Sequence, residues 1–282
     1  MKGIGDTMRT ECQVCMHHCN LEEGQLGKCR ARKNLRGNIT SINYGKITSI
    51  ALDPIEKKPL NRFYPGSSIL SVGSFGCNLN CPFCQNYSIS MVKEDDAEFV
   101  HISPEDLVQK AIKLREKGNI GIAFTYNEPL IGFEYVRDVA KLIHEENMKN
   151  VVVTNGSVTR ETALKVLPYV DAFNIDLKGF TDEFYHMIGG NLETVKEFIK
   201  LAAGVSYVEL TTLIIPDKND SCQEMEKISE WIASVNPEIP LHISRFFPAW
   251  KMKDCEATDV KQIYELAKIA RKKLKYVYTG NC

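Results

Sequence analysis

Short runs rich in β-branched residues alternate with helical patterns through most of this 282-residue chain, an alternation typical of a parallel α/β sheet. The expected strands are Ser68–Gly76, Ile120–Thr125, Asn150–Thr154, Ala172–Leu177, Tyr207–Ile215 and Leu241–Phe246. The expected helices are Pro104–Lys117, Leu130–Glu146, Thr159–Leu167, Glu193–Ala203, Ser221–Ser234 and Thr258–Leu274, before a short apolar run at Tyr276–Tyr278. Six strand–helix units with right-handed crossovers predict an incomplete (β/α)6 barrel, because a full TIM barrel has eight.

The segment before the first of these strands has a different character. It contains a group of cysteines, then the alternating run Asn38–Ile50, which predicts a small hairpin or edge strand. Asp53–Gly66 contains three prolines and is predicted to be an irregular connector. We therefore expect a small cysteine-rich module and connector over residues 1–66 and the barrel over residues 67–282.

Composition and charge exclude several classes of protein. Hydrophobic residues make up 44% of the chain and charged residues 25%, which are ordinary values for a folded domain. The formal net charge of −1 provides no long-range field toward nucleic acid or membrane. No apolar run approaches the roughly 20 residues of a membrane span, and Met1–Thr10 has no signal-peptide core. We expect a cytoplasmic protein.

The ten cysteines are the anomaly in this composition. Seven fall in two tight groups, which in a reducing compartment indicates metal ligation rather than disulfide bonds. The scattered Cys222, Cys255 and Cys282 are expected to be free thiols.

The first group is Cys12, Cys15, Cys19 and Cys29. Four thiolates within this short stretch suit either a tetrahedral zinc ion or a fully ligated iron–sulfur cluster, and His17 or His18 could replace one of them at zinc. An unmetallated or redox-active group is the remaining alternative. A basic stretch follows, formed by Lys28, Arg30, Arg32, Lys33 and Arg36. A zinc knuckle beside basic residues can bind single-stranded RNA, but we favour a solvated basic loop.

The second group, Cys77, Cys81 and Cys84, comes directly after the first expected strand, where barrel enzymes place catalytic groups. Three cysteines can bind three irons of a [4Fe–4S] cube and leave the fourth iron open to a substrate, whereas an electron-transfer cube has four. A zinc site formed by this loop alone would lack its fourth ligand. Iron–sulfur is the favoured interpretation, with structural zinc as the alternative.

This C-x3-C-x2-C loop, with Phe83 before its last cysteine, resembles that of the radical S-adenosylmethionine (SAM) superfamily. The resemblance implies that the open iron chelates the methionine moiety of SAM, and that one electron from the reduced cluster gives methionine and a 5′-deoxyadenosyl radical. It implies that Glu128, in Tyr126-Asn127-Glu128-Pro129, binds the methionine ammonium, although the family usually has two glycines before this glutamate. The remaining candidate SAM contacts are Asn155, Asp176, Lys178 and Arg245 for polar groups and Phe83 for adenine, with Phe246, Phe247 or Ile214 as further adenine candidates.

Longer motifs narrow the resemblance to one group within this superfamily. CQVCMHHCNLEEGQLGKCRARKN, the stretch around GCNLNCPFCQN, and FTYNEP are similar to radical SAM proteins of the AmmeMemoRadiSam system, relatives of pyruvate formate-lyase activating enzymes. The resemblance implies an oxidoreductase working anaerobically, with an electron donor such as ferredoxin or flavodoxin. The hydrogen donor would be a protein, a peptide or a small molecule.

Three hypotheses follow. The first, which we favour, is a radical SAM enzyme that cleaves SAM and abstracts hydrogen from a substrate. The second is a zinc-dependent nucleic-acid-binding module, which leaves the motifs at the strand ends unexplained. The third is a non-catalytic, partner-binding protein on a degenerate barrel.

Overall fold

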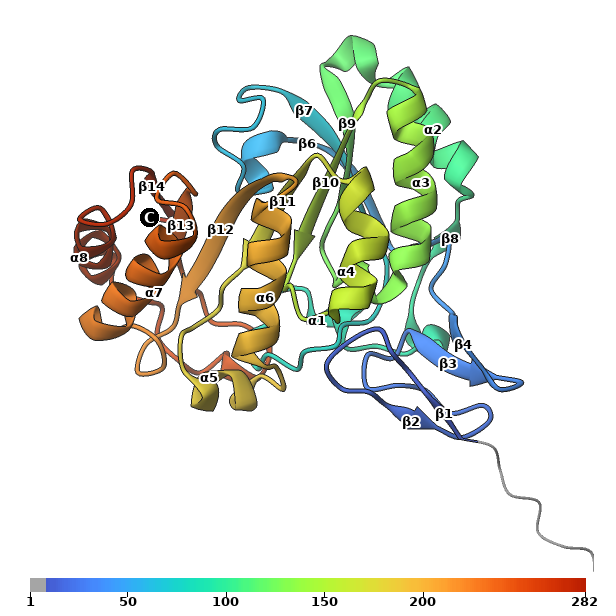
Figure 1. Ribbon diagram of the computed structural model, residues 1–282, viewed down its shortest axis with the longest axis horizontal. Coiled ribbons are helices and arrows are strands. Elements are labelled where there is room, and N and C mark those ends of the chain that lie inside the picture. Colours follow the sequence, from blue (N-terminus) through green and yellow to red (C-terminus); the bar gives the residue numbers. More distant parts are fainter. Residues whose placement is uncertain (1–8) are drawn as a thin grey trace, which may run out of the picture.

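The computed structural model describes residues 9–282, and its centre is an eight-stranded sheet in the order β14-β13-β12-β11-β10-β9-β7-β6 (Figure 1). The parallel strands are β7 (Ser68–Gly73), β9 (Asn119–Phe124), β10 (Lys149–Thr154), β11 (Ala172–Asp176), β12 (Tyr207–Ile214), β13 (Leu241–Arg245) and β14 (Val277–Gly280). The predicted partial barrel is confirmed. The apolar run Tyr276–Tyr278, which lies outside the six predicted units, contributes β14, and β14 pairs with β13 as a seventh parallel strand.

Helices connect successive strands and cover the outer face of the sheet (Figure 1). They are α2 (Pro104–Lys113), α3 (Phe133–Glu145), α4 (Arg160–Val166), α6 (Leu192–Ala203), α7 (Cys222–Val235) and α8 (Val260–Ala270). Ser103 caps α2 by accepting a hydrogen bond from the Asp106 amide, and serine is a favoured residue at this position. Two short helices were not predicted, α1 (Tyr87–Ser90) and α5 (Asp182–Met187), because neither is long enough to show a helical period.

The Pro-rich connector closes the amino end of the barrel. It follows β6 (Ser49–Pro54), which pairs antiparallel with β7, so residues 49–54 of the 1–66 segment join the barrel sheet. Ile55 and Leu60 are fully buried and pack in one apolar cluster with residues of β7, β9, β10 and β11. The buried Glu209 accepts hydrogen bonds from the Asn61 and Arg62 amides at 3.1 and 2.8 Å. This connector is therefore a plug, held by apolar packing and by a buried carboxylate.

The N-terminal module lies at the opposite edge of the barrel, where the parallel strands end (Figure 1). It contains the pair β1 (Thr10–Glu11) and β2 (Asn20–Leu21) and a hairpin formed by β3 (Arg32–Leu35) and β4 (Asn38–Ser41). The hairpin expected within Asn38–Ile50 does not form, because β4 pairs with the earlier β3 instead. β5 (Lys46–Ile47) pairs with β8 (Val100–His101) beyond it. The division at residue 66 stays a prediction.

The prediction of a fully solvated basic loop is wrong for Arg32, which is 3% exposed. Its guanidinium donates to both carboxylate oxygens of Glu134 on α3, at 2.9 and 2.6 Å, and to the carbonyl of Ile131. Such a bidentate pair is the geometry that stabilises a buried arginine. Arg32 thus attaches the module to the barrel instead of facing solvent.

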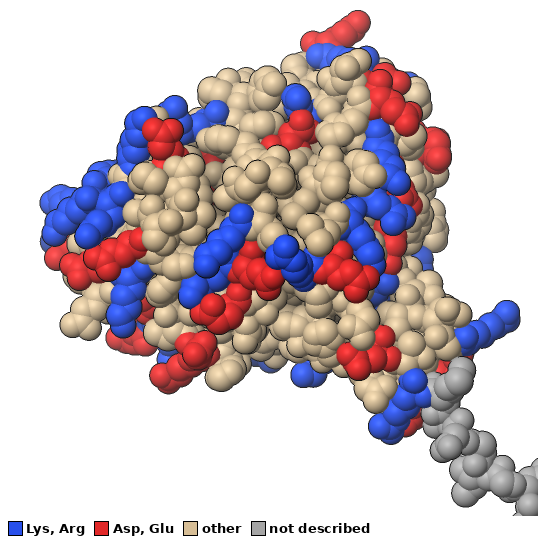
Figure 2. Space-filling model, viewed as in Figure 1, with Lys and Arg blue, Asp and Glu red and all other residues tan. Residues whose placement is uncertain are grey.

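The sequence also predicts that the chain has neither a membrane span nor an export signal. In the described part of the chain, no helix has the length and apolar character of a membrane span. The export-signal prediction concerns mainly residues 1–8, which lie outside the described residues. On the face drawn in Figure 2, basic and acidic side chains are interspersed.

Candidate active site

A pocket of about 310 Å³ opens at the carboxyl ends of the barrel strands. The predicted residues that line it are Cys77, Cys81, Phe83, Cys84, Glu128, Asn155, Asp176 and Lys178. They come from the loops after β7, β9, β10 and β11, and because parallel strands end at the same edge, these loops meet there. The structure therefore brings together the three cysteines, Phe83 and the polar SAM candidates, but not Arg245 or the further adenine candidates Phe246, Phe247 and Ile214.

The cysteine loop is held in place by backbone and side-chain contacts on both sides. The Asn80 amide donates to the Ile188 carbonyl at 2.8 Å. The Asn78 side chain donates from Nδ2 to the Ser157 carbonyl at 2.8 Å, and its Oδ1 accepts from Asn155 Nδ2 at 2.9 Å. The loop is thus tied to α5 and to the loop after β10, which fixes the three thiols at the pocket.

The surroundings of the thiols suit an anionic cluster. The Leu79 amide donates to Cys77 Sγ at 3.4 Å, and Asn155 Nδ2 lies 3.6 Å from the same sulfur. Burial raises the pKa of the Cys77 thiol, and burial raises that of Cys81 to about 12 although nearby Lys178 lowers it. Cluster binding would therefore release protons from these thiols.

None of the ten cysteines is joined to another by a disulfide bond. Among residues 9–282, no three Cys, His, Asp or Glu side chains surround a single point as a mononuclear metal site requires. A [4Fe–4S] cube makes no such demand, since each thiolate binds a different iron.

Glu128 is 2% exposed, and its carboxylate accepts three hydrogen bonds. The donors are the Thr154 hydroxyl at 2.7 Å, the Asn155 amide at 2.8 Å and the Leu130 amide at 3.0 Å. Burial raises the pKa of Glu128 to about 7, and these donors partly offset that effect. A carboxylate has about four acceptor positions, so one position is left for a ligand.

Asp176 and Lys178 stand side by side after β11, with Lys178 Nζ 2.8 Å from Asp176 Oδ2. Burial alone would lower the pKa of Lys178, but the Asp176 carboxylate and the Cys81 thiol outweigh it and raise the pKa. The pair is partly buried in the pocket, so it is available to a polar ligand there. Phe83 is buried beside Phe184, their ring centroids 6.3 Å apart.

Arg245 does not reach the pocket. Its Nε donates to the Thr258 carbonyl at 2.6 Å, and its guanidinium lies over the Phe247 ring. Ser244, the residue before it, lines the pocket, and successive residues of a strand point to opposite faces. Phe246 and Ile214 are fully buried in the core and Phe247 is 40% exposed, and none of the three lines the pocket.

The N-terminal cysteines lie close to one another and to the cluster loop. The sulfurs of Cys19 and Cys29 are both within 4 Å of where a Cβ on Gly27 would stand. Burial raises the pKa of Cys12, Cys29 and Cys15, the last to about 12, and neighbouring thiols of the group add to each shift. The group is therefore a set of soft ligands, of which Cys12, Cys15 and Cys29 are buried.

The module also contacts the peptide around Cys77 directly. The Cys77 amide donates to the Cys29 carbonyl at 3.2 Å. His17 Nε2 lies 2.7 Å from the Asn78 carbonyl, and Arg30 donates to the Cys77 carbonyl at 3.4 Å. His17, predicted as an alternative zinc ligand, thus uses one ring nitrogen on the cluster loop.

Several pocket residues were not predicted as site residues. They are Leu79, Gln85, Asn86, Ser90, Met91, Thr125, Tyr126, Asn127, Val153, Thr154, Thr211, Leu213, Ser244 and Asn281. Thr154 stood beside a chosen residue and was within reach of sequence reasoning. Asn281 follows β14, and counting that strand would have placed it at the same edge.

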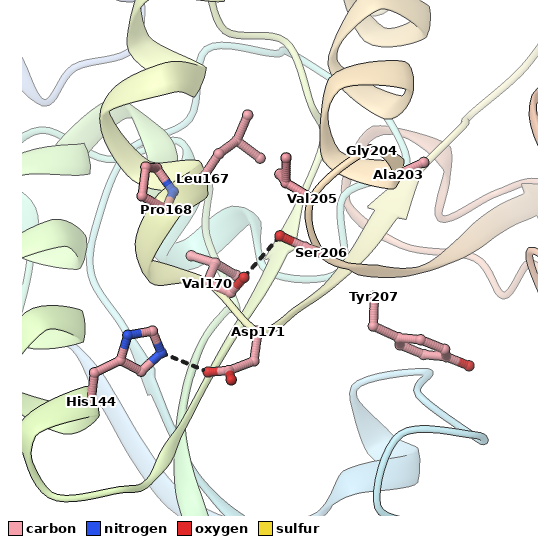
Figure 3. A pocket seen from close by; sticks show the side chains of 10 residues that line it. All are labelled: His144, Leu167, Pro168, Val170, Asp171, Ala203, Gly204, Val205, Ser206 and Tyr207. Atoms are coloured by element: carbon pink, nitrogen blue, oxygen red, sulfur yellow. Dashed lines mark hydrogen bonds and ion pairs between the residues drawn. The ribbon is translucent and has the colours of Figure 1, made fainter.

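A second hollow lies at the amino ends of the strands (Figure 3). Here the Asp171 carboxylate accepts from His144 at 2.9 Å, from Lys149 at 3.0 Å and from the Asn150 amide at 2.8 Å. Ser206 donates to the Val170 carbonyl, so no hydroxyl nucleophile is paired with the histidine. These contacts join β10, β11 and α3, a role that fits the amino face of a barrel.

A partial barrel with a three-cysteine loop and a buried glutamate at one pocket defines a class of cluster-dependent enzymes, and the comparisons agree. The model of the radical SAM superfamily matches residues 71–232. An uncharacterized protein of Methanocaldococcus jannaschii is 39% identical over 279 residues, covering 98% of this chain and 82% of the relative. The chain belongs to the radical SAM superfamily.

Other relatives are more distant. The pyruvate formate-lyase-activating enzyme of Clostridium pasteurianum is 24% identical over 230 residues, covering 74% of this chain and 93% of that enzyme. Streptococcus suis SuiB shares the fold with a TM-score of 0.59 and 13% identity, covering 75% of this chain and 48% of SuiB. The hydrogenase maturase HydG of Carboxydothermus hydrogenoformans has a TM-score of 0.53 and 16% identity, covering 72% of this chain and 51% of HydG.

Membership makes this protein an enzyme whose cofactors are a [4Fe–4S] cluster and SAM.

Proposed function

We propose that Cys77, Cys81 and Cys84 hold the [4Fe–4S] cluster and that the pocket beside them binds SAM. The observation that carries this proposal is that the three thiols, the Glu128 carboxylate and the Asp176–Lys178 pair line one pocket. Held by these three cysteines, the reduced cluster would supply the one electron needed to cleave the sulfonium C–S bond of SAM, so that methionine and a 5′-deoxyadenosyl radical able to abstract hydrogen from a substrate would result.

Glu128 binds the methionine ammonium in this proposal. Three protein donors fix the carboxylate and leave it one acceptor position, so an ammonium completes its set of partners. The buried carboxylate is thereby stabilised in its ionised form, because an adjacent cation lowers its pKa.

The other polar groups of the pocket take the remaining parts of SAM. Lys178 offers a cation to the methionine carboxylate, and Asp176 offers an acceptor to the ribose hydroxyls. Asn155 orients Asn78 and contacts Cys77 Sγ, so it links the cluster loop to the SAM site. Phe83 offers its ring to the adenine from the wall of the pocket.

The hydrogen donor in this proposal is a protein or peptide. The name of the C. pasteurianum relative supports this, since it activates pyruvate formate-lyase. SuiB, which shares the fold, has been solved with its precursor peptide SuiA. Longer motifs support membership of the AmmeMemoRadiSam group, and an electron donor such as ferredoxin or flavodoxin would reduce the cluster.

The N-terminal group is a second metal site in this proposal. Cys12, Cys15 and Cys29 are buried and Cys19 is partly exposed. These four soft ligands suit an auxiliary iron–sulfur cluster, or a zinc ion toward which the thiols would have to converge further. Either metal would stabilise the small module, whose strands are two to four residues long.

Metal analysis and low-temperature electron paramagnetic resonance of anaerobically reconstituted protein test these assignments. We expect the reduced wild-type protein and Cys255→Ala, which removes an exposed thiol, to give a cluster signal that SAM alters. Cys81→Ala should lose that SAM-sensitive signal, while any metal bound at the N-terminal group remains. A SAM-sensitive signal in Cys81→Ala would contradict the proposed ligand set.

A further inference from the structure

The segment that positions Glu128 has an unusual backbone. Tyr126 has a φ of +72°, in the left-handed region that a residue with a Cβ adopts only at a cost in free energy. It stands two residues before Glu128, where glycines would adopt this conformation without strain. Something in the structure must therefore hold Tyr126.

The holding contacts come from the N-terminal segment. The Tyr126 hydroxyl donates to Asp53 Oδ2 at 2.8 Å, and Lys58 Nζ donates to the same oxygen at 2.8 Å. The Lys58 ammonium also lies 4.7 Å from the centre of the Tyr126 ring. Asp53 and Lys58 side chains are 14% and 4% exposed, so water competes little for these contacts.

The space around the ring is shaped for it. A Cβ on Gly73, at the end of β7, would lie 2.9 Å from the Tyr126 Cβ and 3.0 Å from its Cδ2. No other residue type fits at Gly73 without moving Tyr126.

The protonation states of Tyr126 and Asp53 also stay constant around neutral pH. Burial and the Asp53 carboxylate raise the pKa of Tyr126 to about 12. Burial would raise the pKa of Asp53, but hydrogen bonds from Lys58 and Tyr126 hold it at about 2. The phenol therefore stays a donor and the carboxylate an acceptor across the working range of pH.

The rest of the loop is tied to the cluster loop. The Tyr126 carbonyl accepts from Asn86 Nδ2 at 2.8 Å. The Asn127 side-chain amide donates to the carbonyls of Phe75 and Gly76 at 3.2 and 3.1 Å, and its oxygen accepts from the Ser74 amide at 3.0 Å. Tyr126 and Asn127 thus connect the Glu128 loop to both β6 and the cysteine loop.

We propose that Tyr126, Asp53 and Lys58 form an anchor that positions the Glu128 loop for SAM, in place of the conformational freedom that glycines would provide. Tyr126 is a positioning residue acting through Glu128, and its phenol is turned to Asp53 rather than to the ligand. The inference rests on the proposed role of Glu128 in binding the methionine ammonium.

The experiment compares substitutions at Tyr126 in cluster-loaded protein. SAM affinity is measured by equilibrium dialysis, and hydrogen exchange of the 124–130 segment is measured without SAM. We expect Tyr126→Phe and Asp53→Asn to weaken SAM affinity roughly three- to tenfold and to speed the exchange of this segment. Tyr126→Ala keeps the backbone strain and loses the anchor, so it should have the weakest SAM affinity of the series. Tyr126→Gly relieves the strain, so its SAM affinity should recover to within about threefold of wild type.

Tyr44→Phe is the matched control, because the Tyr44 hydroxyl donates to Asp138 Oδ2 at 3.0 Å and neither residue lines the pocket. It should change neither measurement. Two results would overturn the proposal. One is wild-type SAM affinity and hydrogen exchange in Tyr126→Phe, and the other is a SAM affinity of Tyr126→Gly no higher than that of Tyr126→Ala. Failure of the proposed function is distinguishable, since Glu128→Ala would then bind SAM normally while exchange still responded to Tyr126.

Discussion

At the residue scale, the site depends on a carboxylate that the protein buries and then surrounds with donors. The Thr154 hydroxyl and two backbone amides hold Glu128, yet burial still raises its pKa to about 7. A group in this state is only partly ionised at neutral pH, and the pH therefore sets how much of it can pair with an ammonium.

SAM affinity should consequently depend on pH through Glu128. The ionised form exists above the pKa and is lost as pH falls through it, so we expect affinity to drop roughly fivefold between pH 7 and pH 6. Glu128→Gln, which cannot ionise, should bind roughly tenfold more weakly at pH 8 and show a flatter profile. Equilibrium dialysis of the cluster-loaded proteins measures both, and a wild-type profile as flat as that of the glutamine variant would contradict the assignment.

At the scale of elements, the N-terminal module and the cluster loop form one contact. Gly76 has a φ of +88°, and a Cβ there would lie 2.5 Å from the Cys29 carbonyl oxygen. The absence of a side chain at Gly76 is what allows the module to accept the Cys77 amide hydrogen bond.

Gly76→Ala should therefore push the N-terminal module away from the cluster loop, whereas Gly66→Ala should leave this contact intact. Gly66 has a comparable φ of +80° but no atom within 4 Å of its Cβ position. We expect Gly66→Ala to lower the free energy of unfolding by about 1 kcal/mol through backbone strain alone. Gly76→Ala should lower it by roughly 2–4 kcal/mol and reduce iron bound per chain. Equal losses of stability with unchanged iron would show that the contact does not matter.

Sequence reasoning found the elements and residues that a local pattern marks. Asp176 and Lys178 follow a buried run, so their place at the carboxyl edge was predictable. Asp53 and Lys58 were missed because their partner Tyr126 is about 70 residues away and no periodicity records such a contact. Arg32 was misjudged for the same reason, since its partner Glu134 lies on a distant helix.

At the scale of the whole molecule, the two ends of the barrel have separate roles. The carboxyl end holds the pocket and the module, while the amino end is closed by the connector and by the Asp171 contacts. Apart from the Asp53–Lys58 anchor, this separation predicts that the apolar packing of the plug contributes to stability more than to chemistry.

Leu60→Ala tests that separation. Leu60 is fully buried in the plug, so its truncation should lower the free energy of unfolding by roughly 2–5 kcal/mol. Leu164→Ala removes the same atoms from a side chain 52% exposed on α4 and should cost no more than about 0.5 kcal/mol. Urea denaturation of both variants provides the comparison, and equal costs would mean that the connector does not support the fold.

The central claim is that this barrel cleaves SAM at a cluster held by Cys77, Cys81 and Cys84. The most direct test is to reduce the anaerobically reconstituted protein with dithionite, add SAM and quantify 5′-deoxyadenosine by chromatography. We predict that wild type and Cys255→Ala form 5′-deoxyadenosine and that Cys77→Ala forms none. Equal product from Cys77→Ala, or none from wild-type protein with a fully loaded and reduced cluster, would contradict it.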